Sequence, residues 1–206
     1  MYLIGITGMI ASGKTTVAKL YKEMGAYLLN ADKLAHEKLK NSAIKKRVIE
    51  AFGKEILGEN GDIDRARVAE IVFSDGKKLE ELNTIMEKPI TSALRDRIME
   101  LQEGGFPGVV AVDAAMLPRW NLVKAMDVII LVEAPKWQLM NRLVRQRGLL
   151  QEDAERRIEA QESMFKEFHP KKQLIVKNNG DFIELRTNAM QVWMEIKKRT
   201  LAKMEK

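Results

Sequence analysis

The sequence predicts an α/β fold whose centre is a parallel sheet of five strands. Five short apolar stretches are typical of buried strands, and patterns with helical spacing separate them along the chain. Strands that alternate with helices favour a parallel sheet with right-handed crossover connections. A segment of several helices, about residues 31–105, interrupts this alternation between the second and third strands. A chain of 206 residues therefore suits one α/β domain that carries an inserted helical lobe.

The five strands are predicted from runs of apolar residues that lie next to turn residues. They are expected at Tyr2–Thr7, Ala26–Leu29, Val109–Val112, Val128–Val132 and Leu174–Val176. The run at Val128–Val132 is the longest that is strictly apolar, and it is far too short to cross a bilayer. We therefore expect no membrane-spanning segment.

The segment between the second and third strands predicts several helices. Helices are expected near Lys33–Lys40, near Ala43–Phe52, after "NGDID", near Gly76–Lys88 and at Pro89–Gln102. Pro89 suits the first turn of the last of these helices, where its missing N–H costs no hydrogen bond. Gly104 and Gly105 then end that helix.

A long helix is predicted at the end of the chain. Asp181, with Glu184 three positions later, is typical of a helix N-terminus. An apolar stripe follows at Leu185, Ala189, Val192 and Ile196, and Met190 and Trp193 beside it are expected in the core.

The composition favours a globular protein with anionic ligands. Hydrophobic residues make up 46% and charged residues 31%, and the net charge is +6. A nucleotide and a phosphorylated substrate account for this charge, and no nucleic-acid motif is present. The absence of cysteine excludes disulfides and a thiol nucleophile. We expect a cytoplasmic protein, a monomer or weak homo-oligomer, with no membrane or nucleic-acid partner.

The stretch "GMIASGKT" at residues 8–15 lies between the first strand and the first helix. It matches the pattern G-x-x-x-x-G-K-[ST], whose backbone N–H groups and helix N-terminus surround phosphate groups. We expect Lys14 to reach the β- and γ-phosphates of ATP and to face solvent without a ligand. The Thr15 hydroxyl is expected to bind Mg²⁺. The residues expected to hold ATP here are Ala11, Ser12, Gly13, Lys14, Thr15 and Thr16.

Carboxylates follow two of the predicted strands, at the edge where ligands of open α/β sheets bind. Asn30 and Asp32 follow the second strand. Asp32 either caps the next helix or orients an acceptor hydroxyl for in-line attack on a phosphoryl group. Asp113 follows the third strand, and it is either a ligand of the water shell of Mg²⁺ or a turn former.

An arginine-rich segment follows the fourth strand. Arg142, Arg145, Arg147, Arg156 and Arg157 fall within it, and Glu152, Asp153 and Glu155 interrupt it. Such a segment is typical of a lid that closes over phosphates, and part of it is expected to be a salt-bridged helix surface. We expect two or three of these arginines to touch phosphate, with Arg142 in a catalytic role and Arg145 and Arg147 as ATP ligands.

Several segments together resemble the dephospho-coenzyme A kinase family. The P-loop is followed by "NADKLAH", similar to the family's Asp-Ala-Asp pattern, and "FGKEIL" and "NGDIDRARVAEIVF" resemble its phenylalanine-glycine and Asp-Arg segment. "GLLQEDAERRIEAQ" is similar to the family's lid helix. "VKNNG" at Val176–Gly180 resembles a loop that lies by the adenine, which implies that Asn178 takes part in ATP binding. The chain departs from the family at Asn30, Lys88, Ala114–Pro118 and Gln146.

The resemblance implies a three-layer P-loop kinase fold and ATP-dependent phosphorylation of the ribose 3′-hydroxyl of dephospho-coenzyme A, the last step of coenzyme A biosynthesis. It implies a single domain with a core at 1–30 and 106–206, an acceptor-binding insertion at about 31–105 and a lid at about 142–165. Lys14, Asp32 and Arg142 are the expected catalytic residues. Two alternatives remain: another small-molecule P-loop kinase with a nucleoside or nucleotide acceptor, and a nucleotide-gated binding protein without phosphoryl transfer.

Overall fold

The computed structural model describes residues 1–205. The chain forms two compact units. One unit combines Met1–Asn30 with the chain from Asp96 onward, and the other is Ala31–Arg95. None of the helices in the described part of the chain combines the length and the apolar character that crossing a membrane requires.

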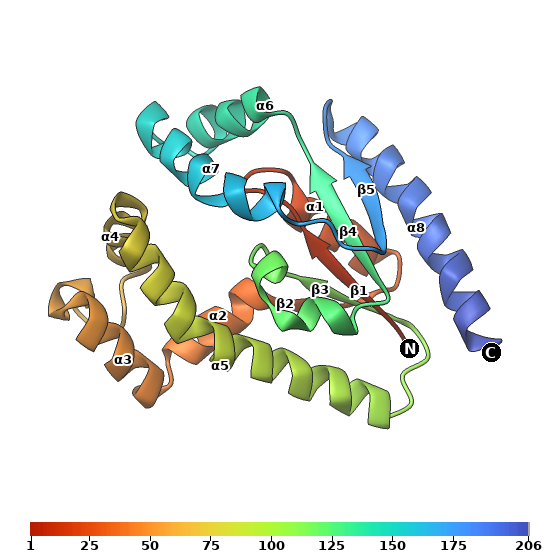
Figure 1. Ribbon diagram of the computed structural model, residues 1–206, viewed down its shortest axis with the longest axis horizontal. Helices are drawn as coiled ribbons and strands as arrows, with labels where there is room; N and C mark the ends of the chain where they lie inside the picture. The colour runs from red at the N-terminus through yellow and green to blue at the C-terminus, as the bar shows by residue number, and fades with distance from the viewer. Residues whose placement is uncertain (206) are drawn as a thin grey trace. The chain divides into compact units, whose positions relative to one another are not determined.

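A single five-stranded sheet forms the centre of the first unit, as the sequence predicts (Figure 1). The strands are β1 (Tyr2–Thr7), β2 (Tyr27–Asn30), β3 (Val109–Asp113), β4 (Val128–Glu133) and β5 (Gln173–Lys177). Their order is β2-β3-β1-β4-β5, and every neighbouring pair is parallel. The predicted α/β class with a parallel sheet is therefore confirmed.

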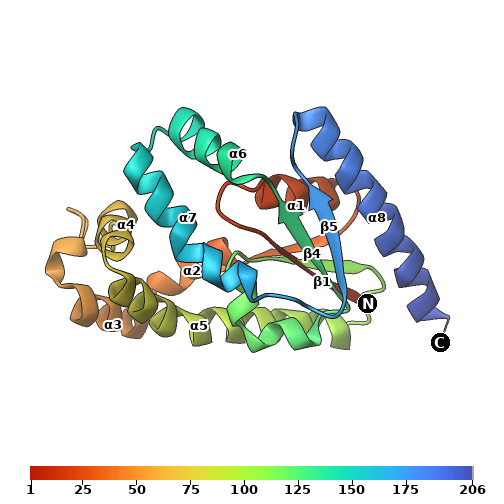
Figure 2. The same ribbon diagram turned by 45° about the horizontal axis from the view of Figure 1, so that its top comes forward.

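The direction in which the chain adds strands to the sheet reverses at the central strand, β1. From the central β1 the chain goes to β2 on one side, whereas β4 and β5 lie on the other side. In open α/β sheets, ligands bind outside the carboxyl ends of the strands at such a switch point. The loop between β1 and α1 (Lys14–Glu23) lies at this end (Figure 2).

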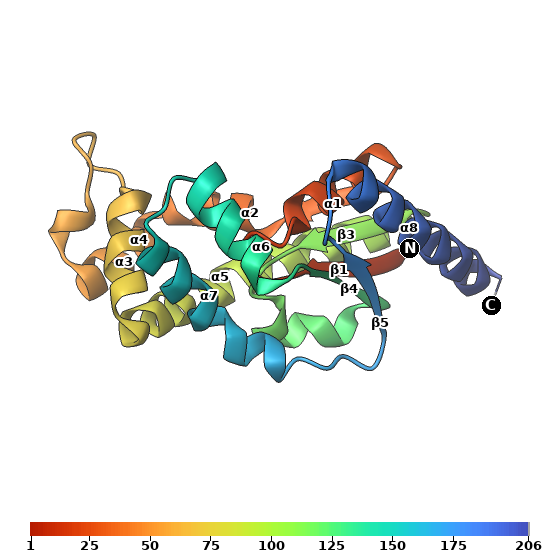
Figure 3. The ribbon, with the colours of Figure 1, turned by 90° about the horizontal axis from the view of Figure 1, so that it is seen from above.

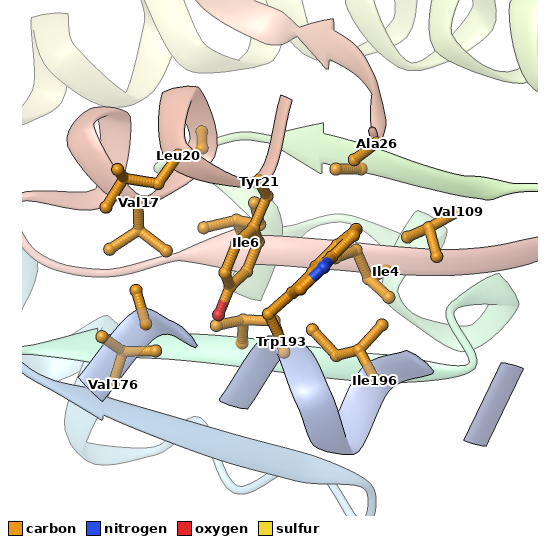
Figure 4. Close-up of a cluster of buried hydrophobic side chains, with 14 of the residues drawn as sticks. Ile4, Ile6, Val17, Leu20, Tyr21, Ala26, Val109, Val176, Trp193 and Ile196 are labelled. Carbon is orange, nitrogen blue, oxygen red and sulfur yellow. The ribbon is translucent and has the colours of Figure 1, made fainter. Parts of the chain in front are cut away.

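Two helices cover one face of the sheet. Helices α1 and α8 (Phe182–Met204) lie side by side on this face (Figure 3). Alternate residues of β1, among them Ile4 and Ile6, pack with them in the main core (Figure 4). The rings of Tyr21 on α1 and Trp193 on α8 are 5.1 Å apart, in a tilted contact.

The opposite face of the sheet is covered by the connection between β3 and β4. This connection forms two 3₁₀ turns, η2 (Leu117–Arg119) and η3 (Asn121–Ala125). Leu117 and Met126 pack beside Gly5 of β1, on the side away from α1. The first unit therefore has three layers, with the sheet in the middle.

The lid segment of the sequence is helical. Helix α6 (Lys136–Asn141) continues into a π-helical turn, η4 (Arg142–Gln146), and α7 (Gln151–Lys166) follows. A π turn adds a residue to the helical path and is frequent at functional sites.

The second unit is helical. It contains α2 (Ala31–Leu39), α3 (Ser42–Phe52), the 3₁₀ turn η1 (Lys54–Ile56), α4 (Arg65–Ser74) and α5 (Gly76–Glu103) as far as Arg95. The side chains of Asn41 and Asp64 accept hydrogen bonds from backbone N–H groups at the starts of α3 and α4. These caps satisfy donors that have no partner within the helix.

Two expectations about helices are wrong. Pro89 lies inside α5 and does not begin a new helix. The ring removes one backbone hydrogen bond, but buried Ile85, Ile90 and Leu94 extend the apolar face of the helix across it. Met190 of α8 is 45% exposed, because the buried stripe of that helix runs through Leu185, Ala189, Trp193 and Ile196.

Candidate active site

The glycine-rich loop leads from the carboxyl end of β1 to the first turn of α1. The Ser12 N–H donates to the Met9 carbonyl at 3.0 Å, which closes a turn at its centre. Ala11 has a φ of 62° and Gly13 a φ of 96°. Left-handed residues among right-handed ones turn successive N–H groups toward one point and form an anion-binding concavity. No side chain in residues 1–205 caps the start of α1, so its first N–H groups remain available to a ligand.

Close contacts require both motif glycines. A Cβ atom on Gly8 would lie 2.4 Å from the Val132 carbonyl oxygen. On Gly13 it would lie 2.2 Å from Nδ2 of Asn178, in a backbone conformation that L side chains rarely adopt. The sequence pattern thus reflects two specific packing constraints as well as a general need for flexibility.

Lys14 forms a buried ion pair with Asp113. Its Nζ lies 2.5 Å from Oδ1 of Asp113, and the side chains are 9% and 0% exposed. The expectation that Lys14 faces solvent without a ligand is therefore wrong. Asn30 donates from Nδ2 to the other carboxylate oxygen of Asp113 at 3.0 Å, because strand register places Asn30 opposite Asp113. Asp113 therefore holds the P-loop lysine, a contact that the sequence analysis did not predict.

Arg142 contacts the P-loop backbone. Its Nη1 donates to the carbonyl oxygens of Ala11 at 3.0 Å and Ser12 at 3.4 Å. Its Nη2 donates to Oε1 of Gln138 at 3.0 Å and to the backbone and side-chain oxygens of Asn178 at 3.1 and 3.0 Å. All of these acceptors are uncharged, and burial lowers the pKa of Arg142 below its ordinary value.

Asn178 links the loop after β5 to the P-loop. It is 5% exposed, and its Nδ2 donates to the Ser12 carbonyl at 2.7 Å. The side chain of Gln138 donates from Nε2 to the carbonyl of Asn179, the residue that follows Asn178. The side chains of Gln138, Asn178 and Arg142 therefore form one hydrogen-bonded group, which contacts the P-loop through the carbonyls of Ala11 and Ser12.

An apolar cluster joins the lid segment to the first half of the loop. Leu139, Leu143, Ala154 and Ile158 are buried together, and Met9, Ile10 and Ala11 pack against them. On α7, Oε1 of Gln161 accepts a hydrogen bond from the Ile10 N–H at 2.7 Å. The variable residues of the motif are therefore the part that contacts the lid segment.

The other predicted arginines differ in their surroundings. Arg145 and Arg147 are exposed at and after the π turn. Arg156 pairs with Asp153 on the surface of α7, as expected for a salt-bridged helix face. Arg157 follows on the same helix.

Asp32 and the threonines complete the predicted set. Thr15 is exposed and Thr16 half-buried in the first turn of α1. Asp32 belongs to the other compact unit, where it is exposed in the first turn of α2. Because α2 begins at Ala31, Asp32 lies inside the helix and does not precede it as a cap.

Two glutamines in contact with this site were missed as site residues by the sequence analysis. Gln138 is 7% exposed and stands four residues before Arg142, so the two side chains share one helix face. This spacing was the available signal in the sequence. Gln161 lies in the segment that resembles the lid helix, but nothing in the sequence indicated its contact, because its partner is a backbone N–H distant in the sequence.

Comparison with known protein families points to the same class of protein as the parallel sheet and the phosphate-binding loop. The family model described as Dephospho-CoA kinase matches residues 2–184. A Dephospho-CoA kinase of Dehalococcoides mccartyi is 33% identical over 91% of this chain and 93% of the relative. One of Arabidopsis thaliana is 35% identical over 96% of this chain and 85% of the relative.

Solved structures show the same fold. The crystal structure of TT1252 from Thermus thermophilus has a TM-score of 0.74 at 26% identity, and the alignment covers 94% of this chain and 96% of that one. A Dephospho-CoA kinase from Campylobacter jejuni has a TM-score of 0.66 at 23% identity, over 95% and 97% of the two chains. With the P-loop geometry and a family match over residues 2–184, this chain belongs to the dephospho-CoA kinase family.

Proposed function

We propose that this protein transfers the γ-phosphoryl group of ATP to the ribose 3′-hydroxyl of dephospho-coenzyme A and so completes coenzyme A biosynthesis. The bond between the γ-phosphorus and the bridging oxygen breaks, a bond to the 3′-oxygen forms, and the hydroxyl proton leaves. ADP and coenzyme A are the products. The observation that carries the proposal is the family match over residues 2–184, which includes the complete phosphate-binding loop.

The P-loop residues have the chemistry to bind ATP. The N–H groups at the start of α1 and the Lys14 ammonium suit an anion, and family membership implies ATP as the phosphoryl donor. Lys14 exchanges its contact with Asp113 for the β- and γ-phosphates when ATP binds. Its charge then stabilises the negative charge of the transition state. Arg145 and Arg147, both exposed, are the lid arginines that we assign to ATP.

Mg²⁺ is the metal that suits these residues. It binds through few protein groups and keeps waters and phosphate oxygens as its other ligands. The Thr15 hydroxyl follows the lysine of the motif and is exposed, so it is free to supply one ligand. When bound, the ion would neutralise the negative charge that develops on the transferred phosphoryl group.

Asp32 is the residue that we assign to the acceptor. Its carboxylate is exposed two positions after the end of β2. An ionised carboxylate accepts the hydrogen bond of a hydroxyl and aligns it for in-line attack. The helical residues 31–95 are assigned to the rest of the acceptor, and the protein is expected to act in the cytoplasm.

An acceptor panel tests the function. Purified protein is incubated with ATP, Mg²⁺ and dephospho-coenzyme A, adenosine, AMP, cytidylate or shikimate, and mass spectrometry identifies the products. We expect 3′-phosphorylated product from dephospho-coenzyme A at a rate far above the others. Faster turnover of another acceptor would make the protein a different small-molecule kinase. ATP binding without turnover of any acceptor would make it a nucleotide-gated binding protein.

A further inference from the structure

The P-loop holds an unfavourable backbone conformation at one residue that is not glycine. Ala11 is the one non-glycine residue with positive φ in residues 1–205. The left-handed conformation is disfavoured for residues with a Cβ atom and persists where the surroundings impose it. The contacts of Ala11 therefore indicate what imposes it.

Two side chains of the lid segment form hydrogen bonds with the loop backbone around Ala11. Arg142 donates to the Ala11 carbonyl at 3.0 Å, and Gln161 accepts from the Ile10 N–H at 2.7 Å. The Ala11 carbonyl belongs to the peptide after Ala11, and the Ile10 N–H belongs to the peptide between Met9 and Ile10. The two contacts therefore fix the peptides at both ends of the Ile10–Ala11 pair. The apolar cluster of Leu143 and Ile158 packs against the same stretch of loop.

The surroundings of Arg142 favour a structural contact over a phosphate contact. Its two terminal nitrogens have five oxygen acceptors on Ala11, Ser12, Gln138 and Asn178. A guanidinium reaches several acceptors at once because its donors form a rigid planar fork. Contact with phosphate through these nitrogens would break some of these hydrogen bonds.

We propose that Arg142 and Gln161 are positioning residues that hold Ala11 in its left-handed conformation, so that the P-loop is formed before ATP arrives. This role differs from the phosphate contact that the sequence suggests for Arg142. The inference deepens the proposed function, since it takes ATP as the ligand of the loop. A loop that is already formed binds more tightly, because less of the binding free energy is used to order it.

The test separates the geometry of Arg142 from its charge. Arg142→Lys keeps the charge but lacks the fork, whereas Arg142→Met lacks both. We expect both variants to weaken ATP binding alike, by roughly 10- to 100-fold in calorimetric titrations with Mg²⁺. Arg186→Met, at an exposed position on α8, is the matched control and should bind ATP as the wild type does.

Ala11→Gly provides the rescue experiment. Glycine adopts the left-handed conformation without the penalty of a Cβ atom. Ala11→Gly is also measured in the wild-type background, so that its own effect on ATP affinity is separated from the rescue in a double-mutant cycle. In the Arg142→Met background it should restore affinity by about 5-fold or more.

Hydrogen exchange without nucleotide gives a readout that is independent of catalysis. The Ile10 and Ser12 amides should exchange faster in Arg142→Met and in Gln161→Met than in the wild type. If Arg142→Met does not fold, Arg142→Lys and Gln161→Met carry the same comparison. Because neither ATP nor acceptor is present, a protein that fails to phosphorylate dephospho-coenzyme A can still show this effect. The proposal is overturned if Arg142→Lys binds ATP as tightly as the wild type, if Ala11→Gly brings no rescue, or if the amides exchange at unchanged rates.

Discussion

At the scale of single residues, Lys14 pairs with Asp113, and the proposed reaction gives it ATP as a second partner. Its ammonium lies 2.5 Å from the buried carboxylate of Asp113. In the proposed reaction the same charge contacts ATP. In that reaction, ATP must replace this ion pair.

Lys14→Ala should affect both activity and stability. We expect turnover at saturating ATP to fall by roughly 10²- to 10³-fold, because a charge aimed at the transition state is lost. The free energy of unfolding should fall by about 3 kcal/mol, because the cation that faces a buried carboxylate is removed. Urea unfolding measures the second effect, and Asp113→Asn in the Lys14→Ala background should recover part of it. Equal stability of wild type and Lys14→Ala would show that the pair contributes nothing.

A substitution at Asp32 should change turnover without a large change in ATP affinity or in the free energy of unfolding. Asp32→Asn should lower turnover by roughly 10²-fold or more while ATP affinity stays near the wild-type value. Its carboxylate is exposed in the first turn of α2, so the free energy of unfolding should fall by less than about 1 kcal/mol. Calorimetry with ATP, a kinase assay and thermal melts measure the three quantities. Normal turnover in Asp32→Asn would remove this residue from the mechanism.

At the scale of elements, the contact between α1 and α8 contains a buried hydroxyl. Tyr21 is fully buried against Trp193, and its Oη has no hydrogen-bond partner within the described chain. The same burial raises the pKa of Tyr21 well above its ordinary value. An unsatisfied buried hydroxyl destabilises the folded state, since the unfolded chain regains water as its partner.

Tyr21→Phe should therefore stabilise the protein, by about 1 kcal/mol in the free energy of unfolding. Tyr27→Phe is the matched control, because Oη of Tyr27 accepts hydrogen bonds from Arg97 at 2.6 and 3.1 Å. That control should be neutral or slightly destabilising. Chemical denaturation of both variants decides the point, and a loss of stability in Tyr21→Phe would contradict the assignment.

At the scale of the whole molecule, the proposed function assigns a separate compact unit, Ala31–Arg95, to an acceptor larger than a nucleoside. Contacts with remote parts of a substrate raise the rate when they orient the reacting hydroxyl. Adenosine, which lacks the pantetheine arm of dephospho-coenzyme A, should therefore lose turnover as well as affinity. Steady-state kinetics at saturating concentrations of each acceptor test this. An unchanged turnover number for adenosine would mean that the arm contributes binding alone.

Features set by neighbouring residues were determined by the sequence itself. The apolar runs located every end of the five strands within one residue, and Asp181 caps α8 as its pattern predicts. The turn "GMIASGKT" was expected between β1 and α1 and lies there. Strand tendency, helix caps and glycine turns depend on contacts within a few residues, so the order of amino acids is sufficient to predict them.

Tertiary structure decided the features that depend on distant residues. It paired Lys14 with Asp113 and placed Arg142 on the Ala11 carbonyl, over separations of 99 and 131 positions. It also made α5 continuous across Pro89, since the burial of apolar side chains before and after the proline outweighed one lost backbone hydrogen bond. The sequence alone determined that a phosphate-binding loop exists and where it lies. The conformation of its residues and the groups that hold them follow from packing between elements, because many partners are sterically possible for one side chain and only the assembled fold selects among them.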